Sequence, residues 1–353
     1  MKLGIVLFNL GGPDGLDAVE PFLRNLFSDP AIISLPGIMR KPLARFVARR
    51  RAPLARTIYQ HMGGRSPILE ETQRQARALE AALAAPGLEV KAVVAMRYWY
   101  PFSEGAAEAL RKFTPDRIVL LPLYPQFSTT TTGSSFADWD WSARKAGLAA
   151  PTARVCCYPG NDGFIAALAE KIRAAMHDPK LGVSYRLLLS AHGLPKRVVA
   201  KGDPYQWQVE QTAHALVDQL GIRDLDWSVC YQSRVGPLEW LDPATDAEIR
   251  RAGVDGKGLV VVPIAFVSEH SETLVELDIE YEKLARATGV PDYRRVATVS
   301  ADKVFVDGLA RLVRKAMQAS EQGRLCINDG EARICPAKFV GCGYGAAPGR
   351  EMN

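Results

Sequence analysis

Residues 258–281 read Gly-Leu-Val-Val-Val-Pro-Ile-Ala-Phe-Val-Ser-Glu-His-Ser-Glu-Thr-Leu-Val-Glu-Leu-Asp-Ile-Glu-Tyr. The first ten residues form an unbroken apolar run, which is typical of a strand buried in a parallel sheet. The remainder predicts a helix capped by Ser268. Spacing by four places three carboxylates on one face of this helix and three apolar side chains on the opposite face: Glu272, Glu276 and Glu280 against Leu274, Leu277 and Tyr281.

This row of carboxylates, with His270 at its head, predicts a face that meets a cation. Like charges at this spacing destabilise a helix by roughly 0.2–0.5 kcal/mol per pair, so three in line indicate a ligand that compensates them. The other interpretation is a solvated acidic face without a ligand. The helix follows directly on a buried strand, and α/β proteins bind ligands at the carboxyl ends of their strands, which favours the first interpretation.

Five further segments are rich in Val, Ile and Leu without strict alternation, as buried parallel strands are: residues 2–10, 90–98, 116–124, 185–191 and 228–233. Helical patterns lie between them. One opens at Ser66 and runs toward Ala84, and a second covers 163–176. A third opens with Asp203 as N-cap, Pro204 at the first helical position and Gln206 as a capping-box residue. The alternation predicts an α/β fold with open parallel sheets flanked by helices on both faces.

The two halves of the chain repeat one pattern. Residues 7–13 (Leu-Phe-Asn-Leu-Gly-Gly-Pro) match 189–195 (Leu-Ser-Ala-His-Gly-Leu-Pro), and residues 119–123 match 260–264. The two offsets, 182 and 141 residues, differ by 41, which predicts a duplication with an insertion of that length in the first half. Pro122 and Pro263 cannot donate to a sheet, so we expect them at bulges or strand ends near a site.

Length and composition are those of a globular protein with two domains: 353 residues, 48% hydrophobic and 24% charged. The sequence has no apolar run of about 18 residues, and the first strand has no signal or transit peptide before it. We therefore expect a protein of the bacterial-type cytoplasm. Its six cysteines, of which Cys156 and Cys157 are adjacent, are expected to be thiols or metal ligands in that reducing compartment.

One segment, residues 30–69, makes the chain basic. It contains eight Lys or Arg and no acidic residue, whereas the whole chain has a net charge of +5. It also contains large apolar residues such as Ile38, Phe46 and Leu54. This combination is typical of a membrane-surface helix or a lip around an amphiphilic anion, and equally of a basic helix that packs its apolar face on its own domain. No nucleic-acid motif accompanies it, and we expect no nucleic-acid partner.

Polar residues follow all six predicted strands, and parallel strands bring such ends to one edge of a sheet. These ends are 9–12 (Asn-Leu-Gly-Gly), 97–100 (Arg-Tyr-Trp-Tyr), 126–128 (Gln-Phe-Ser), 190–193 (Ser-Ala-His-Gly), 231–234 (Tyr-Gln-Ser-Arg) and 269–272 (Glu-His-Ser-Glu). A cleft lined by these edges is the expected binding site. No glycine pattern for nucleotide phosphates is present in the sequence.

His192 and Glu272 are the natural chemical pair at these edges. A neutral imidazole binds a divalent transition metal or takes a proton, and a carboxylate beside it can do either. A histidine after a strand is more often a structural residue. Here Gly193 permits a tight turn that leaves the imidazole at the tip of the strand, which favours a functional role.

Five motifs, in this order along the chain, resemble those of ferrochelatases: 9–13 (Asn-Leu-Gly-Gly-Pro), 124–128 (Tyr-Pro-Gln-Phe-Ser), 189–195, 231–237 (Tyr-Gln-Ser-Arg-Val-Gly-Pro) and 263–281. The resemblance spans roughly residues 3–320. It implies two Rossmann-like lobes, with parallel sheets flanked by helices and a cleft between them. It also implies insertion of ferrous iron into protoporphyrin IX to form protohaem, with release of two protons.

The resemblance further implies that His192 and Glu272 are the metal-site residues and that the segment 30–69 forms hydrophobic lips around the porphyrin. In this chemistry we expect His192 to accept a proton and Glu272, with His270 nearby, to hold or relay the iron. Glu276 and Glu280 are the candidates for a path of metal or protons. A flat apolar disc with two carboxylates needs apolar walls, cations and hydroxyls, for which the candidates are Leu10, Tyr59, Ser66 and Arg97.

The expected organisation is an α/β lobe over 1–150 with the insertion near 30–69, a second α/β lobe over 151–320, and a cysteine-containing tail over 321–353. Some ferrochelatases carry a [2Fe-2S] cluster on cysteines of the tail and one internal cysteine. The candidates here are Cys326, Cys335 and Cys342, with Cys156, Cys157 or Cys230 as fourth ligand; a protein without a cluster is the alternative. No organic cofactor is expected, and ferrous iron is a substrate.

Two other functions stay open at this point. One is a related chelatase that accepts coproporphyrin, or that inserts cobalt or nickel into sirohydrochlorin. The other is a non-catalytic haem-binding protein, which would share the cleft but would not need a histidine beside a row of carboxylates. The expected partners are protoporphyrin IX and ferrous iron, in a monomer or homodimer with peripheral membrane contact as an open alternative.

Overall fold

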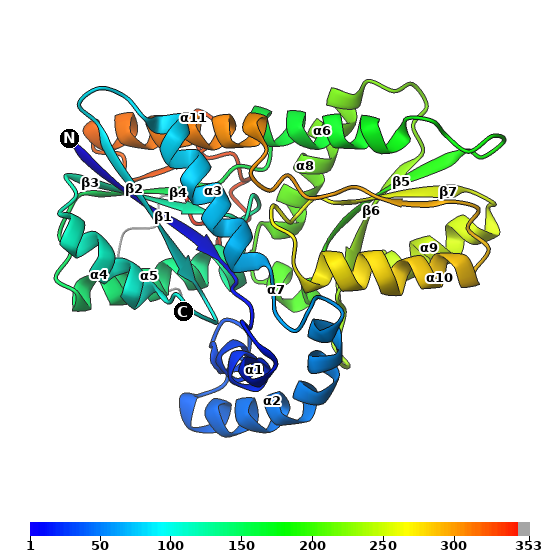
Figure 1. Cartoon of the computed structure of the whole chain (residues 1–353), viewed down its shortest axis with the longest axis horizontal. Coiled ribbons are helices and arrows are strands. Elements are labelled where there is room, and N and C mark those ends of the chain that lie inside the picture. Colours follow the sequence, from blue (N-terminus) through cyan, green and yellow to red (C-terminus); the bar gives the residue numbers. More distant parts are fainter. Residues whose placement is uncertain (345–353) are drawn as a thin grey trace.

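The computed structural model describes residues 1–344, and residues 345–353 of the expected tail lie outside the described residues. Two parallel sheets form its framework (Figure 1). The first has the order β2-β1-β3-β4-β9: β1 Lys2–Asn9, β2 Glu89–Met96, β3 Arg117–Pro122, β4 Thr152–Cys157 and β9 Cys326–Asn328. The second has the order β6-β5-β7-β8: β5 Tyr185–His192, β6 Trp227–Gln232, β7 Gly258–Pro263 and β8 Tyr293–Arg295.

Helices cover both faces of the sheets, which confirms the predicted α/β class. They are η1 Leu16–Ala18, α1 Val19–Ser28, α2 Gly37–Gln60, α3 Ile68–Leu83, α4 Ser103–Phe113, η2 Thr129–Gly133, α5 Ser134–Lys145, α6 Asp162–Met176, α7 Lys196–Ala200, α8 Tyr205–Leu220, α9 Thr245–Val254, η3 Glu272–Tyr281, α10 Glu282–Ala287 and α11 Lys303–Glu321. The elements η2 and η3 are π-helices. None of the helices among residues 1–344 combines the length and the apolar character needed to cross a membrane.

One continuous core joins the two lobes. It takes buried side chains from both sheets and from α3, α6, α8 and α11. Figure 1 shows α6 and α11 running along the same side of both sheets. The opposite faces have separate cores, one with α4 and α5 on the first sheet and one with α9 and α10 on the second. The two lobes therefore share one core on the side of α6 and α11, and each lobe has its own core on the opposite face of its sheet.

All six predicted strands are present. The sequence did not predict β4, β8 or β9, and β4 and β9 belong to the first sheet. The expected boundary at residue 150 therefore misplaces β4, and the expected tail contributes β9 to the first lobe. The strand β4 (Thr-Ala-Arg-Val-Cys-Cys) is short and carries a charged residue, so its composition differs from that of the other buried strands.

The two sheets share one topology. The order β2-β1-β3-β4 repeats as β6-β5-β7-β8, in agreement with the predicted duplication. Pro122 and Pro263 are the last residues of β3 and β7, as expected for residues that cannot donate to a ladder. A π-helix follows each of these two strands, η2 in the first lobe and η3 in the second.

Two predicted helix starts are wrong in detail. Ser268 is not an N-cap, because its hydroxyl donates to the buried Gln75 side chain and the helix begins only at Glu272. At α8 the Asp203 side chain does accept a hydrogen bond from the backbone N–H of Tyr205. The Gln206 side chain, however, bonds forward to Glu210 instead of closing a capping box.

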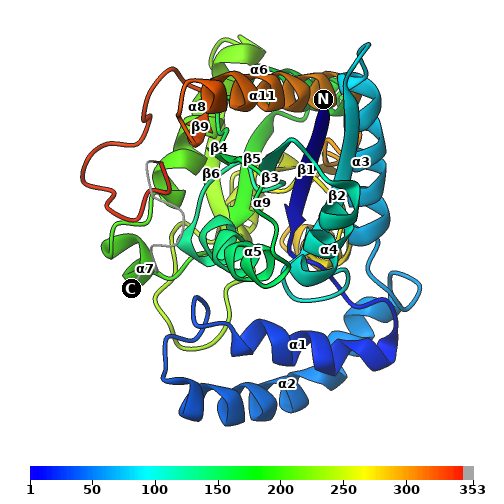
Figure 2. The ribbon, with the colours of Figure 1, turned by 90° about the vertical axis from the view of Figure 1, so that its left-hand side faces the viewer.

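The basic insertion forms α2, which lies side by side with the preceding helix α1 below the two sheets (Figure 2). Three small residues on one face of α2, Ala44, Ala48 and Ala52, are fully buried. The large apolar residues Phe46 and Leu54 are 64% and 71% exposed. The alternative in which the large apolar residues pack on their own domain is therefore wrong for these two, since close packing uses the alanines.

Candidate active site

The tip of β5 and the first turn of η3 bring His192 and Glu272 together. Nδ1 of His192 lies 2.8 Å from Oε2 of Glu272, although the residues are 80 positions apart in the chain. The side chains are 42% and 23% exposed, so both can be reached from solvent. The parallel pairing of β5 with β7 produces this contact, because it brings the end of β5 level with the segment that leads into η3.

His270 is the third side chain beside His192 and Glu272. It is buried, and its Nδ1 lies 3.0 Å from the carbonyl oxygen of Ser268, to which a protonated Nδ1 donates. This bond directs Nε2 toward Glu272, whose Oε2 is 3.8 Å away. Two imidazoles thus face one carboxylate oxygen. Imidazole and carboxylate are both ligand types of divalent transition metals, although these three side chains are not grouped tightly enough to form a closed metal site by themselves.

Electrostatics makes Glu272 an anion. Burial would raise its pKa, but the attraction and the hydrogen bond of His192, with a further contribution from His270 3.8 Å away, outweigh burial and hold its pKa well below the ordinary value. Burial would lower the pKa of His192, and the same attraction raises it above the usual range. Burial and then repulsion by Glu272 raise the pKa of Glu276. Negative charge therefore concentrates on Glu272.

The carboxylates of η3 do not form the simple ridge of an α-helix. Glu276 is partly buried and accepts hydrogen bonds from Gln232, Ser233 and Tyr281, whereas Glu280 is exposed. Tyr281 was predicted to lie on the opposite face from Glu276. It contacts Glu276 because a π-helix aligns residues five apart, whereas an α-helix aligns residues four apart.

The insertion reaches this site through Tyr59. The Tyr59 ring is buried at the end of α2, and its hydroxyl contacts the side chain of Ser271 next to Glu272. Ser66 lies against the turn after β1: its backbone N–H donates to the carbonyl of Pro13 at 2.8 Å, and a Cβ on Gly12 would come within 2.5 Å of its Oγ. Leu10, directly after β1, lies in the same turn region.

Arg97, the fourth candidate for porphyrin contact, is engaged inside the first lobe. Its guanidinium is 2.9 Å from Asp29 and 3.6 Å from Asp138, and its Nε donates to Ser134. These carboxylates already compensate its charge. The structure therefore does not place Arg97 with His192 and Glu272 as a free cation.

A family model described as Ferrochelatase matches residues 2–317 of the chain. The ferrochelatase of Caulobacter vibrioides is 54% identical over 318 residues, which cover 90% of each chain. That of Phenylobacterium zucineum is 54% identical over 322 residues, covering 91% of this chain and 93% of the relative. That of Pelagibacter ubique is 45% identical over 345 residues, covering 97% and 98%.

The chain belongs to the ferrochelatase family.

As a member of this family the chain is a metal chelatase, a lyase that inserts ferrous iron into protoporphyrin in haem biosynthesis. Solved structures agree with the fold. The sirohydrochlorin chelatase SirB of Bacillus subtilis, in its cobalt complex, has a TM-score of 0.52 at 13% identity over 92% of this chain and 99% of its own. SirB with Fe3+ has a TM-score of 0.55 at 15% identity with the same coverage. At these identities the likeness shows the fold alone, so it does not favour cobalt or nickel insertion.

Five of the six cysteines of this ferrochelatase lie together. A β-bulge in β4 brings Cys156 and Cys157 to the same side, where their sulfurs are 3.2 Å apart. Cys156 also contacts Cys326, Cys157 contacts Cys335, and Cys335 contacts Cys342. Thiol contacts lower the pKa of Cys157 to about 7. Cys230 lies apart in the core of the second lobe, which removes it as a fourth ligand.

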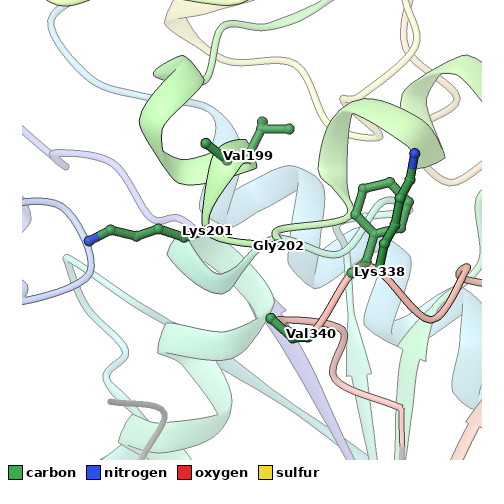
Figure 3. A pocket seen from close by; sticks show the side chains of 7 residues that line it. Val199, Lys201, Gly202, Lys338 and Val340 are labelled. Atoms are coloured by element: carbon green, nitrogen blue, oxygen red, sulfur yellow. The ribbon is translucent and has the colours of Figure 1, made fainter.

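One pocket lies between residues 199–202 and residues 338–340 of the tail. It has a volume of about 400 Å³, and His192 is not among the residues that line it. Figure 3 shows the side chains of Lys201 and Lys338 pointing away from each other. They do not converge on one anion, and we assign the pocket no part in metalation.

No pattern in the sequence identifies the residues at the start of α8 that hold the two site loops in place. Tyr205 donates from its hydroxyl to the carbonyl of His192 at 3.1 Å. Asp203 accepts from the backbone N–H of Thr129 at 2.7 Å and from the hydroxyl of Ser128 at 3.0 Å. One helix start therefore fixes the strand tip that carries His192 and the loop after β3. Ordinary polar residues at a helix start do not reveal such partners.

Proposed function

We propose that this ferrochelatase metalates protoporphyrin IX with His192 as the proton acceptor and Glu272 as the residue that holds ferrous iron. The observation that carries the proposal is the 2.8 Å contact between the His192 imidazole and the Glu272 carboxylate at the exposed strand tip. The bond at Nδ1 leaves Nε2 of His192 for a pyrrole proton. Glu272 is an anion that stabilises the imidazolium so formed, and its carboxylate can also bind the cation.

The iron is a transferred ion, so few protein ligands suffice. Ferrous iron enters with bound water, and the two pyrrole protons leave as the four porphyrin nitrogens take over the coordination. His270 supplies a second imidazole toward Glu272. Glu280, exposed on η3, and Glu276, one turn closer, are proposed as the path by which metal arrives or protons leave.

The direct test of this assignment is the porphyrin specificity of metalation together with the loss of activity at the site. The protein should convert protoporphyrin IX and ferrous iron to protohaem under anaerobic conditions. Sirohydrochlorin with cobalt should be a poor substrate pair. A protein that inserts cobalt into sirohydrochlorin faster than ferrous iron into protoporphyrin would contradict the proposal. Faster metalation of coproporphyrin would change the assigned tetrapyrrole but keep the site.

We also propose a [2Fe-2S] cluster on the tail. The fit rests on the donor set: Cys326, Cys335 and Cys342 lie in contact with the internal pair Cys156 and Cys157. Within residues 1–344 no three His, Cys, Asp or Glu side chains surround one point closely enough for a single metal ion. A [2Fe-2S] cluster needs four thiolates shared between two irons, and the contacts supply cysteines in pairs. When bound, it would supply a redox-active group and tie β4 to the tail.

Visible absorbance of anaerobically purified protein tests the cluster. Wild type and the control Cys230→Ser should show the same cluster bands, because Cys230 lies in the other lobe. Cys335→Ser should lose them, since Cys335 touches both Cys157 and Cys342. Single changes of Cys156 and Cys157 then identify the internal ligand. Colourless wild-type protein with no bound iron would contradict the cluster and leave the proposed metalation site untouched.

The helix α2 is proposed as a surface for an anionic lipid bilayer. It presents exposed apolar side chains together with exposed cations and carries no acidic residue. Apolar anchoring plus electrostatic attraction is how peripheral helices bind anionic membranes. Such a contact would bring the entrance of the porphyrin site to the bilayer, where an apolar substrate dissolves.

A further inference from the structure

We infer that Gln232 is a positioning residue for metalation, which holds the first turn of η3, and with it Glu272, opposite His192. The inference rests on the site proposed above and adds a residue that does not touch the metal. Gln232 is the last residue of β6 and is fully buried. In the parallel register it pairs with His192 at the end of β5, so the two strand tips lie side by side.

Neighbouring hydroxyls fix the orientation of the Gln232 amide. Oε1 accepts a hydrogen bond from the hydroxyl of Ser190 at 2.8 Å, and that hydroxyl lies 3.1 Å from the hydroxyl of Thr245. Ser190 and Thr245 are both fully buried. Because Oε1 is used on the strand side, the Nε2 donors face η3.

The two donors of Nε2 are used at two successive turns of η3. One goes to the carbonyl oxygen of Glu272 at 2.9 Å, and the other to Oε2 of Glu276 at 3.1 Å. π-helices are rare and are mostly limited to a single turn, whereas η3 spans ten residues, so hydrogen bonds from outside the helix help to hold it. Gln232 supplies such a hydrogen bond at Glu272, the residue whose side chain contacts His192.

Ser233 also binds η3, through the Glu276 carboxylate. Its backbone N–H donates to Oε1 of Glu276 at 2.7 Å and its hydroxyl to Oε2 at 2.5 Å. Ser233 also has a φ of 60°, in the left-handed region that costs a non-glycine residue about 1 kcal/mol or more. The chain keeps a strained residue where it anchors η3, which indicates that the position of η3 matters.

The test is Gln232→Met, which keeps the length of the side chain and removes all three hydrogen bonds. We expect the KM for ferrous iron to rise and kcat/KM for iron to fall about 10- to 100-fold, as for residues that orient a metal ligand. The dissociation constant for protoporphyrin, measured by fluorescence quenching, should stay at the wild-type value. A general loss of structure would not separate the two substrates in this way.

Gln126→Met is the matched control. Gln126 follows a strand whose end was expected to line the cleft, but it is only 2% exposed and its amide donates to Thr212 and to the carbonyl of Ile264. The change therefore removes buried hydrogen bonds without touching η3 or the pair His192 and Glu272. It should lower the melting temperature about as much as Gln232→Met and leave the KM for iron near wild type. Should Gln232→Met fail to fold, Ser233→Ala, at a partly exposed residue, should raise the KM for iron with porphyrin binding intact.

Two outcomes would overturn the inference. One is a folded Gln232→Met protein with the wild-type KM for iron. The other is an equal loss of metalation in Gln232→Met and Gln126→Met, which would show a purely structural effect. A wild-type protein that does not metalate protoporphyrin at all would instead contradict the proposed function, so the two failures are distinguishable.

Discussion

Replacing His192 is predicted to slow metalation without weakening the binding of porphyrin. His192→Ala should reduce the rate of metalation by about 10²–10⁴-fold, the contribution expected of a positioned general base. Porphyrin binding should persist, because Tyr59 and the turn at Leu10 are unchanged. Single-turnover metalation with prebound porphyrin measures the first quantity and fluorescence quenching the second. A variant that metalates at the wild-type rate would remove His192 from the mechanism.

The pair formed by His192 and Glu272 also predicts a pH dependence. The raised pKa of His192 means that the charged pair stabilises the protein below the ordinary histidine pKa, and this contribution is lost as pH rises through the raised value. A proton-accepting imidazole must be neutral, so metalation should increase with pH over the same interval. In NMR titrations of the metal-free protein we expect a midpoint above about 6.5 for His192.

The control for this titration is Glu272→Gln. It removes the attraction and keeps the burial, so the His192 midpoint should fall below that of the wild-type protein. Equal midpoints in the two proteins would show that Glu272 does not set the charge of His192.

Single residues were predictable where sequence neighbours identify them. His192 and Glu272 could be paired because both follow buried strands, and the ends of such strands meet at one edge. The predicted position of Tyr281, on the helix face opposite Glu276, was wrong, because no periodicity in the sequence distinguishes a π-helix from an α-helix. The engagement of Arg97 with Asp29 could not be foreseen, since the partners are 68 positions apart and no repeat connects them.

Among the elements, α2 carries a prediction about lipid binding. The protein should bind vesicles containing an anionic lipid, and binding should weaken with salt. Replacing Phe46 and Leu54 together by serine should weaken binding about 10-fold or more, because both side chains are mostly exposed and would insert. Leu181→Ser, at a fully exposed position of the second lobe, is the control and should bind like wild type. Equal binding of the double variant and wild type would contradict this role, and concentration-dependent dimers would indicate a second copy as the occupant.

Strands and helices were predictable to the extent that composition marks them. The six strands rich in Val, Ile and Leu were found, whereas β4 and β9 were not, because Arg154, Cys156 and Cys326 carry no strand signal. The capping-box role of Gln206 and the helix start at 268 were misjudged. Gln206 bonds to Glu210 within its own helix, and Ser268 bonds across the lobes to Gln75 instead of capping its own helix.

For the whole molecule, the join between the lobes predicts a stability effect. Gln75 of α3 is fully buried and donates to the carbonyls of Val267 and Ser300 in the other lobe. Gln75→Ala should lower the free energy of unfolding by about 2–3 kcal/mol, because it leaves buried polar groups without partners. The exposed neighbour Gln73→Ala should change it by less than about 0.5 kcal/mol. Denaturant titration measures both, and a Gln75→Ala protein as stable as Gln73→Ala would contradict the role of this join.

The presence of two lobes could be predicted from the duplicated strand motifs, but the assignment of each chain segment to its lobe could not. The repeat located β1, β3, β5 and β7 and the insertion between them. It could not show that β4 and β9 return to the first sheet, or that α6 and α11 share one core across both lobes. Those features depend on packing between segments far apart in the sequence.

The most direct test of the account is stopped-flow loss of porphyrin emission after anaerobic mixing with ferrous iron, in wild type, Glu272→Gln and Glu280→Gln. We expect rapid loss in wild type, a rate lower by at least about 10- to 100-fold in Glu272→Gln with porphyrin still bound, and a much smaller effect in Glu280→Gln. Metalation by Glu272→Gln at the wild-type rate would contradict the claim that His192 and Glu272 together form the metal site.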